Sequence, residues 1–578
     1  MSGKDKLSTR KQPFGKEVSI ARRLASRTTH PTAVYFHYTK QNFGIPSNTK
    51  TAFQLQSIET DNLRKYQKGI LEEEIASMTV SKSISSASGS FSLSLFPTQN
   101  WKAKLSAGDW ILIYMNDQYG GRGRYEGKNL NSKNLLIMGN IDRVSRSLTK
   151  NEDTDKIELR YVVSGKNFGK VFEKTDIWYD PYANQEKTLD IALINAGLEI
   201  QGNPSDMCEK LVNVFLKRGG EFPTGRTPDL NNWVMPSEIV SIMNATTTGT
   251  PTPDVTNPRF ADVLNLEIEP DLPGFKARQM LTLNSNGSLH EMLKRSSNDV
   301  VNELFYEEVR DSGGFVKPTM VLRNRPINTP FFSSHFGFSG GAPKQADVDK
   351  AVNAINNKIT TMQDLAKTSF IEISPAEVKY EDLGRDDHSK FNMWWLRTTN
   401  NYEHAFSMLS NLNKKNGIAN PTIIRGGVQR DGLRRFEQTL EFCYRQGTDK
   451  KTAIQGVGPN IELFTGFMAQ LYDMHFANHL YDGGTITTSG VLEAELGKAL
   501  ILLPDPNYKA AQPKAYYIEG YEHEWSFPKH WTTTWTVSHG QFKTNTQNIF
   551  IDSTTDDNGA PDTLLDNVYL AKTKTGRN

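Results

Sequence analysis

The sequence contains very little cysteine. Its 578 residues include only Cys208 and Cys443. Both lie in runs that are typical of a buried helix or strand, so a disulfide framework and a cysteine-rich zinc site are both excluded. We therefore expect a fold that needs neither a disulfide nor an oxidising compartment.

The chain also lacks long apolar runs and an excess of charge of either sign. No run approaches the roughly 18 apolar residues that a membrane span needs, and the first residues lack the apolar core of a secretory signal. The net charge is +2, from 67 basic and 65 acidic residues, which gives no overall attraction to nucleic acid or to an anionic membrane. The sequence predicts a soluble protein that can bind polyanions only locally.

The length predicts about three to five domains. Residues 1–50 are predicted to form a basic, extended arm that gains order against a partner, because their polar composition cannot bury enough apolar surface to fold alone. An organelle transit peptide is the alternative interpretation of this segment. The basic residues of the arm are Lys4, Lys6, Arg10, Lys11, Lys16, Arg22, Arg23 and Arg27.

Residues 51–180 show a series of strand patterns, which predict a β-sandwich or barrel. Phe91 to Phe96 alternates large apolar residues with serine, and Trp110 to Tyr114 follows a turn at Ser106–Asp109. A strand from Leu135 to Met138 is expected to end at Gly139-Asn140, and residues 156–163 are expected to form the next strand. The glycine-rich loop 116–133 lacks the strand-before, helix-after setting of a phosphate-binding loop.

Residues 181–370 are predicted to mix helices with a hairpin. Asn203 and Pro204 start a helix whose apolar face includes Met207, Leu211, Val212 and Phe215, and Ser288 to Glu291 forms a capping box for a second helix. Residues 302–306 and 319–323 are two strands around Gly313-Gly314. Apolar residues at helical spacing predict two further helices, one from Val352 to Leu365 and one, already in the next segment, from Tyr402 to Leu409.

Residues 371–548 return to strands, and residues 549–578 are predicted to be a flexible tail. Strands are expected at Thr485–Thr487 and at Lys498–Leu503. The aromatic-rich run 516–540 predicts a long hairpin with Trp531, Thr533, Trp535 and Val537 on one face. Glu522-His523-Glu524 could suggest acid-base chemistry, but neighbouring strand residues point to opposite faces, so His523 should project away from both glutamates.

Two other groups suggest chemistry only weakly. His475 and His479 stand four residues apart on a predicted helix, with Asp473 and Asp482 near, which makes a metal pair conceivable. Glu381, Asp382, Asp386, Asp387 and His388 could supply paired carboxylates for glycoside hydrolysis, although such runs are mostly solvated loops. No nucleophile elbow, Walker loop or HExxH motif is present. We therefore predict no catalytic residue, no cofactor and no metal ligand, and no enzymatic activity.

Three segments, in this order, resemble the central baseplate hub protein of contractile-tailed bacteriophages, which is related to the base of the type VI secretion spike protein. The first combines residues 90–95 with 105–113 and 137–144, where Gly108-Asp109 makes the turn between strands. The second is Asn302–Phe305 with Leu322–Pro326. The third joins Gly483–Thr487 and Leu496–Lys498 to the hairpin from Tyr516 to Gly540. Together they cover most of residues 51–545.

The resemblance implies a β-rich α+β fold in which two tail-tube-like β-barrel modules, 51–180 and 371–548, flank a mixed α/β insert, 181–370. It also implies a structural virion protein: a homotrimeric baseplate hub that joins the tail tube to the central spike, adapts six-fold to three-fold symmetry and surrounds the DNA path. The implied partners are the chain itself, tail tube or tube-initiator proteins, the spike, and baseplate wedge proteins contacted by the arm. DNA would pass through the lumen without tight binding, and assembly would occur in the cytoplasm of the bacterial host.

A second function class stays open at the level of the sequence. Tryptophans on a protein surface can stack on sugars, so the chain could instead be a carbohydrate-binding or carbohydrate-cleaving tail protein. The candidate tryptophans are Trp394, Trp395, Trp531 and Trp535. Packing in a barrel core is the competing interpretation of these residues, and exposure in a groove would favour the sugar-binding one.

Overall fold

The structure is a computed structural model. It describes residues 29–38, 66–116, 132–150, 157–177, 201–202, 204–217, 233, 235–244, 259–270, 272, 277–278, 287–299, 301–311, 313–326, 365–366, 368–398, 422–423, 425–440, 471, 474–475, 478–504, 513–527 and 531–542. None of the helices in these ranges is long and apolar enough to cross a membrane.

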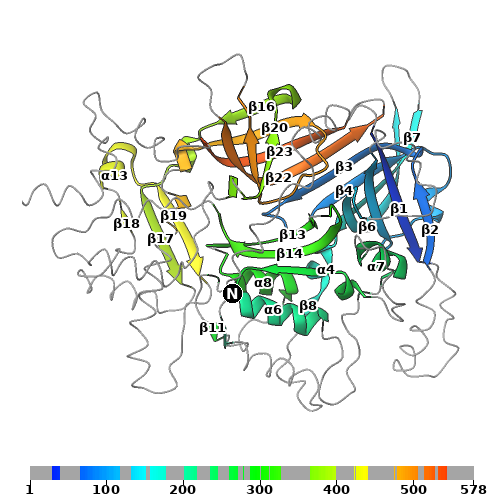
Figure 1. Cartoon of the computed structure of the whole chain (residues 1–578), viewed down its shortest axis with the longest axis horizontal. Helices are drawn as coiled ribbons and strands as arrows, with labels where there is room; N and C mark the ends of the chain where they lie inside the picture. The colour runs from blue at the N-terminus through cyan, green and yellow to red at the C-terminus, as the bar shows by residue number, and fades with distance from the viewer. Residues whose placement is uncertain are drawn as a thin grey trace, which may run out of the picture.

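One 13-stranded sheet dominates the fold and contains strands from both halves of the chain (Figure 1). Its order is β16-β20-β23-β22-β3-β4-β7-β6-β5-β1-β2, and β21 carries β15 beside it. The N-terminal strands are β1 (His30–Tyr38), β2 (Tyr66–Leu71), β3 (Ile75–Ser83), β4 (Ser90–Leu95), β5 (Trp110–Asn116), β6 (Leu135–Lys150) and β7 (Ile157–Asn167). The C-terminal strands are β15 (Phe370–Ile373), β16 (Val378–Gly384), β20 (Asp482–Ser489), β21 (Ala499–Leu502), β22 (Lys514–Ser526) and β23 (Thr532–Phe542).

The two halves of the sheet meet where β3 pairs with β22, and we call this ladder the seam. It is antiparallel and runs from Gly520 opposite Ser83 to Ser526 opposite Ser77. The first part of β22 pairs instead with β21, from Lys514 to Tyr517. Because β22 is 13 residues long, one of its edges holds β21 at one end and β3 at the other, while β23 lines the opposite edge.

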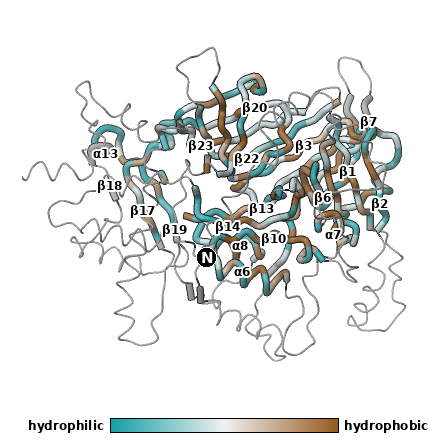
Figure 2. Tube along the Cα trace, in the orientation of Figure 1, coloured by the Kyte–Doolittle hydropathy of each residue, from teal (hydrophilic) through white to brown (hydrophobic). Residues whose placement is uncertain are grey.

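Each half of the sheet has its own apolar core, because alternate strand residues point to opposite faces. In the N-terminal half, Tyr35, Val80, Leu93, Ile113 and Val163 come from five strands and belong to one buried cluster. In the C-terminal half, a separate cluster is built on β15, β20, β22 and β23 and includes Ile371, Ile486, Ile518, Tyr521 and Trp535. Figure 2 shows the resulting alternation of hydrophobic and hydrophilic residues along the strands.

A second layer lies beneath the sheet and consists of a hairpin covered by helices (Figure 1). The hairpin strands are β13 (Asn302–Arg310) and β14 (Val316–Asn324), and β10 (Asn265–Ile268) pairs with β14 in parallel. The helical elements of this layer are α4 (Gly169–Lys174), α6 (Pro204–Val212), the π-helical η5 (Asn213–Lys217), α7 (Ser237–Asn244), η6 (Phe260–Asp262) and α8 (Leu289–Ser297).

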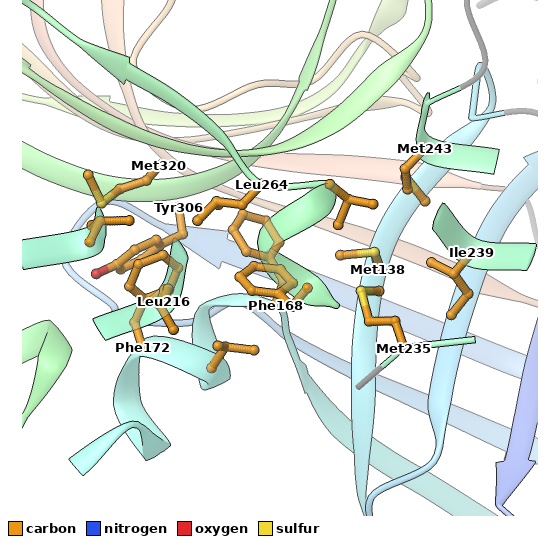
Figure 3. Close-up of a cluster of buried hydrophobic side chains, with 14 of the residues drawn as sticks. Met138, Phe168, Phe172, Leu216, Met235, Ile239, Met243, Leu264, Tyr306 and Met320 are labelled. Atoms are coloured by element: carbon orange, nitrogen blue, oxygen red, sulfur yellow. The ribbon is translucent and has the colours of Figure 1, made fainter. Parts of the chain in front are cut away.

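The helical layer packs through a cluster of buried aromatic and aliphatic side chains (Figure 3). Phe172 of α4 lies against Tyr306 of β13, with 4.4 Å between ring centroids, and Phe168 lies 5.9 Å from Phe260. Met138 of β6 joins the same cluster, so the hairpin and its helices pack on the face of the N-terminal strands that is opposite the Tyr35 cluster. Strand β13 is consequently buried on both faces along most of its length.

Short elements complete the described chain. The paired strands are β8 (Asp176–Ile177) with β12 (Gly287–Ser288), β9 (Gln201–Gly202) with β11 (Ala277–Arg278), and β17 (Met393–Thr398) with β18 (Thr422–Ile423) and β19 (Arg435–Leu440). The helical pieces are η2 (Trp101–Ala103), η7 (Pro375–Glu377), η8 (Asp387–Ser389), α13 (Arg425–Asp431) and η9 (Asn478–Leu480).

Several predicted elements are confirmed. The run 516–540 forms the β22–β23 hairpin, with Trp531, Trp535 and Val537 buried on one face. Ser288 and Glu291 form the capping box of α8, and the 302–323 hairpin turns at Gly314, whose φ is +81°. The two helices predicted from Val352 and from Tyr402 lie almost entirely outside the described residues, as do Cys443 and the glycine-rich loop.

Two predicted boundaries are wrong. The strand at Leu135 does not end at Gly139-Asn140, because β6 continues for 16 residues to Lys150 and changes its partner at this point from β5 to β7. Residues 1–50 are not all arm, because β1 lies in the sheet between β5 and β2 with Val34 and Phe36 buried. The apolar run from Ala33 to Tyr38 is short, and its burial depends on strands that follow much later in the sequence.

A substitution at Gly139 tests whether β6 continues past this residue. A Cβ atom at this position would lie 2.3 Å from the carbonyl oxygen of Lys166 and 3.0 Å from the Phe91 ring. We expect Gly139→Ala to lower the free energy of unfolding by about 1–3 kcal/mol, since backbone must shift to admit the methyl group. Urea unfolding followed by tryptophan fluorescence measures the change.

Gly384→Ala is the matched control, because a Cβ there meets nothing within 4 Å. It should change the unfolding free energy by less than about 1 kcal/mol. Equal effects of the two substitutions would contradict the close contact at Gly139.

Candidate functional site: a buried ion network at the seam

A lysine and two glutamates lie buried where the hairpin layer meets the seam. Lys82 of β3 places its Nζ 2.6 Å from Glu307 Oε1 and 2.6 Å from Glu308 Oε2, both on β13. All three side chains are at most 2% exposed. Tyr521 of β22 donates its hydroxyl to Glu307 at 3.0 Å. We call Lys82, Glu307 and Glu308 the Lys82 triad. It includes β3 through Lys82 and bonds to β22 through Tyr521, so it contacts both strands of the seam.

A second buried ion pair lies on the same hairpin and joins β14 to β13. Arg323 of β14 donates from Nε to Glu303 Oε1 at 2.7 Å, and Tyr517 of β22 donates its hydroxyl to the same carboxylate at 2.6 Å. Arg323 also donates to the carbonyl of Gly497 at 2.5 Å. The hairpin is thus bonded to β22 at two points, Tyr517 and Tyr521.

Backbone amides satisfy much of the remaining capacity of the buried carboxylates. Glu307 Oε2 accepts from the amide of Leu496 at 3.2 Å, and Glu308 Oε1 accepts from the amide of Met138 at 2.9 Å. Glu495, which pairs with Lys498 at 2.9 Å, accepts from the amide of Arg310 at 3.3 Å. The network therefore fixes β3, β6, β13, β22 and the loop before β21 relative to one another.

Burial and mutual charge shift the pKa values of this network. Burial raises the pKa of Glu307 to about 7, and the neighbouring carboxylates of Glu308 and Glu495 add to the rise, against the lowering effect of Lys82. Burial alone would lower the pKa of Lys82, but Glu307 and Glu308 outweigh it and hold that pKa well above its usual value. Two carboxylates thus share one lysine, and one of them takes up a proton near neutral pH.

The network is suited to holding elements together. Each of its carboxylates is already engaged by protein donors, and the four glutamates are at most 4% exposed. Replacing one member of a buried ion group leaves an uncompensated charge, which costs several times more than breaking an ion pair on the surface. The arrangement therefore specifies which strands meet and in what register.

The two histidines that made a metal pair conceivable are held by protein contacts. Burial lowers the pKa of His475 to about 3 and that of His479 to about 4, so both imidazoles are neutral. His475 stacks on Phe436 at 4.2 Å and bonds to Asn478 at 3.0 Å. Within the described ranges, no group of three or more His, Cys, Asp or Glu side chains could hold a metal ion; Asp473 lies outside these ranges.

The acidic run is a surface feature. Glu381 and Asp382 lie exposed on β16, Asp386 caps η8, and Asp387 pairs with Arg434 at 2.7 Å. His523 is buried and bonds to Thr533 at 3.0 Å, whereas Glu522 and Glu524 are exposed on the other face, as predicted. The acidic run is therefore exposed, and Asp386 and Asp387 are already bonded within the chain.

The tryptophans proposed for sugar binding are mostly core residues. Trp394, Trp531 and Trp535 are at most 4% exposed, so core packing, the competing interpretation, is confirmed for three of the four. Trp395 is partly exposed and lies under two guanidinium groups, at 4.9 Å from Arg397 and 5.7 Å from Arg435. The structure therefore removes the observation on which the carbohydrate alternative depended.

Sequence reasoning missed the ion network. The signal was present in the run Asn302–Arg310, where three glutamates interrupt an otherwise apolar and aromatic strand. Glutamate is rarely buried without a partner, so acidic residues inside such a strand indicate buried cations elsewhere in the chain. Nothing local identifies Lys82 as that cation, since it lies 225 residues from Glu307.

No family model and no curated protein matches the sequence. Similar solved structures include the 43 kDa tail protein of prophage MuSo2 from Shewanella oneidensis, at 10% identity and a TM-score of 0.34, covering 82% of this chain and 94% of that chain. Another is the tail protein from Neisseria meningitidis MC58, at 9% identity and a TM-score of 0.38. The match covers 88% of this chain and 96% of that chain.

A third similar structure is an Escherichia coli component of the type VI secretion system, itself similar to the T4 bacteriophage tail proteins gp27 and gp5. The identity is 8% and the TM-score 0.32, covering 81% of this chain and 73% of that one. These neighbours are of the class that the sequence resemblance named, phage tail and type VI secretion proteins. With TM-scores below 0.5 they carry no functional argument, so the function is inferred from this chain's own contacts.

The Lys82 triad predicts a large effect of removing its cation. Lys82→Met should lower the free energy of unfolding by about 3–5 kcal/mol, because Glu307 and Glu308 remain buried without a counter-charge. Lys102→Met is the control, since Lys102 is exposed on η2 and should change stability by less than about 1 kcal/mol. Urea unfolding of both variants at pH 7.5 tests this, and similar losses would contradict the triad.

The raised pKa of Glu307 predicts that the stability of the fold decreases as the pH rises. Its folded pKa of about 7 lies above the ordinary value of 4.5, so the folded chain binds the extra proton. Below about pH 4.5 the raised pKa of Glu307 adds roughly 3 kcal/mol to the free energy of unfolding. This contribution is lost as the pH rises through 7.

The comparison with Glu307→Gln isolates this group from the buried histidines, which titrate in both proteins. Between pH 5 and pH 8 the wild type should lose stability relative to the glutamine variant. A stability difference that stays constant with pH would contradict the raised pKa.

Proposed function

We propose that this chain is a structural virion protein, the trimeric hub of a contractile-tail baseplate that joins the tail tube to the central spike. The observation that carries the proposal is the seam. Two halves of one chain are joined edge to edge in one sheet by the antiparallel β3–β22 pair. Each half has an apolar cluster, and Trp525 and Trp531 of the second half also join that of the first. One chain therefore already contains the lateral contact from which a tube wall is built.

The argument for a ring starts from strand edges. A sheet that ends in unpaired strands exposes backbone donors and acceptors, and closure removes that hazard. In the two proposed tube-like barrel modules, β3–β22 pairing closes one such edge within the chain. Repeating lateral contacts between copies would close the others and generate a closed ring.

The copy number follows from two modules in each chain. Three copies supply six modules, which match a six-fold tube above, and retain three-fold symmetry for a trimeric spike below. Such a ring would adapt one symmetry to the other and surround the DNA path. The near-neutral balance of the chain, +2 overall, suits a lumen that lets DNA pass without holding it.

The proposed partners are the chain itself, the tail tube or its initiator, and the central spike, with wedge proteins contacted by the N-terminal arm. We also propose that the protein is not an enzyme. The buried acids Glu303, Glu307 and Glu308 are bonded to protein groups, which suits a rigid connector in the baseplate.

Cross-linking mass spectrometry on intact purified particles tests this function. We expect cross-links from this chain to itself, to the tube protein and to the spike protein, because a hub contacts all three. Cross-links to receptor-binding fibre proteins, with none to tube or spike, would contradict the proposal.

A further inference from the structure

Part of strand β6 has an edge with which no other described strand pairs. Its residues Leu135–Asn140 pair with β5, but beyond Ile141 only β7 pairs with it among the described strands. Residues 143–150 therefore extend past β5 with one edge unpaired, and we call this stretch of β6 the ribbon; β4 pairs with β7 behind residues 143–146, and only residues 147–150 with 157–160 are two-stranded among the described strands. Exposed along this edge are Arg143, Arg146 and Leu148, and Leu148 is 61% exposed.

A second unpaired edge lies on β16. Within the described strands, β16 is the end of the sheet and pairs only with β20. It exposes Lys379, Tyr380, Glu381 and Asp382, so two acids outnumber one lysine, and Tyr380 is 59% exposed. Figure 1 labels β7, the partner of the ribbon strand, and β16 at separate places on the sheet.

The two edges are complementary in charge, in apolar content and in length. The ribbon edge is basic and β16 is acidic, and each exposes one large apolar side chain. An antiparallel register that places Arg146 opposite Asp382 also places Leu148 opposite Tyr380. The same register sets Tyr380–Gly384, the part of β16 beyond its bulge, against residues 144–148 of β6.

We propose that β16 of one copy pairs antiparallel with the ribbon edge of β6 in the next copy. Arg146 and Asp382 then form a cross-strand ion pair, and Leu148 and Tyr380 cover each other from water. Neither Arg146 nor Asp382 belongs to a described ion pair within the chain. The pairing is head-to-tail, because one copy presents β16 and the other the ribbon, so it generates a ring when the rotation closes.

This inference rests on the proposed ring of copies and names the surface that closes it. The other end of the sheet, β2, is a weaker candidate for the same role. Its Lys68 already pairs with Glu238 of α7 in the same chain. Strand β2 therefore lacks an unused charge at this position, whereas β16 presents two adjacent acidic residues.

A charge-swap cycle in the full-length chain tests the register. We expect Arg146→Glu alone and Asp382→Arg alone each to weaken self-association about threefold to thirtyfold, because each places like charges opposite one another. The double variant Arg146→Glu/Asp382→Arg should return the association to within about threefold of the wild type, as opposite charges again face each other. Sedimentation equilibrium over a concentration series measures all four proteins.

Lys102→Glu, which makes the same charge change on exposed η2, is the control and should leave association unchanged. Leu148→Asp gives an independent readout and should weaken association at least about tenfold, since it sets a carboxylate beside Tyr380 and Asp382. Circular dichroism of each variant checks that the fold is intact.

Three results would overturn the inference: a wild type that stays monomeric at every concentration, single variants that associate like the wild type, or a double variant without recovery. If the variants have no effect while the particle contains a ring of this chain on its axis, the pairing fails and the proposed hub stands. If the chain lies away from the axis, the hub fails whatever the solution result.

Discussion

The buried charge of Lys82 is the constraint on which the arrangement of the layers depends. An ammonium group that is 2% exposed is stable only with carboxylates beside it, and Glu307 and Glu308 supply them from a strand 225 residues later. Tyr521, 214 residues beyond Glu307, then completes the group from the other side of the seam. A misplaced β3, β13 or β22 would leave at least one of these charges without its partner.

An apolar contact in the same place could supply as much stability but less selectivity. Hydrophobic packing tolerates a shift of register, whereas a buried lysine between two carboxylates and a tyrosine does not. The second pair, Arg323 with Glu303, is another buried ion pair on the hairpin, and Arg323 also donates to the carbonyl of Gly497. We infer that both pairs serve to hold the hairpin layer rigidly across the seam, as a connector between two symmetric neighbours would require.

Local features of the fold could be predicted from the sequence because neighbouring residues determine them. The capping box at Ser288, the turn at Gly314 and the alternation in the 516–540 hairpin each depend on residues within one short run. The features that sequence reasoning missed depend on distant contacts. Gly139 has the composition of a strand end, but it lies in close approach to Lys166 within a longer strand. Nothing in the residues next to Lys82 distinguishes it from an exposed strand lysine, yet it is 3% exposed.

The central claim is that this chain, with two β modules joined in one sheet, is the two-module unit that repeats three times around an axis. Electron microscopy of the whole particle tests it most directly, because a reconstruction gives both position and copy number. The account predicts three copies around the tail axis between tube and spike, each contributing two β modules to the wall. Six copies in the ring, or a peripheral position away from the axis, would contradict it.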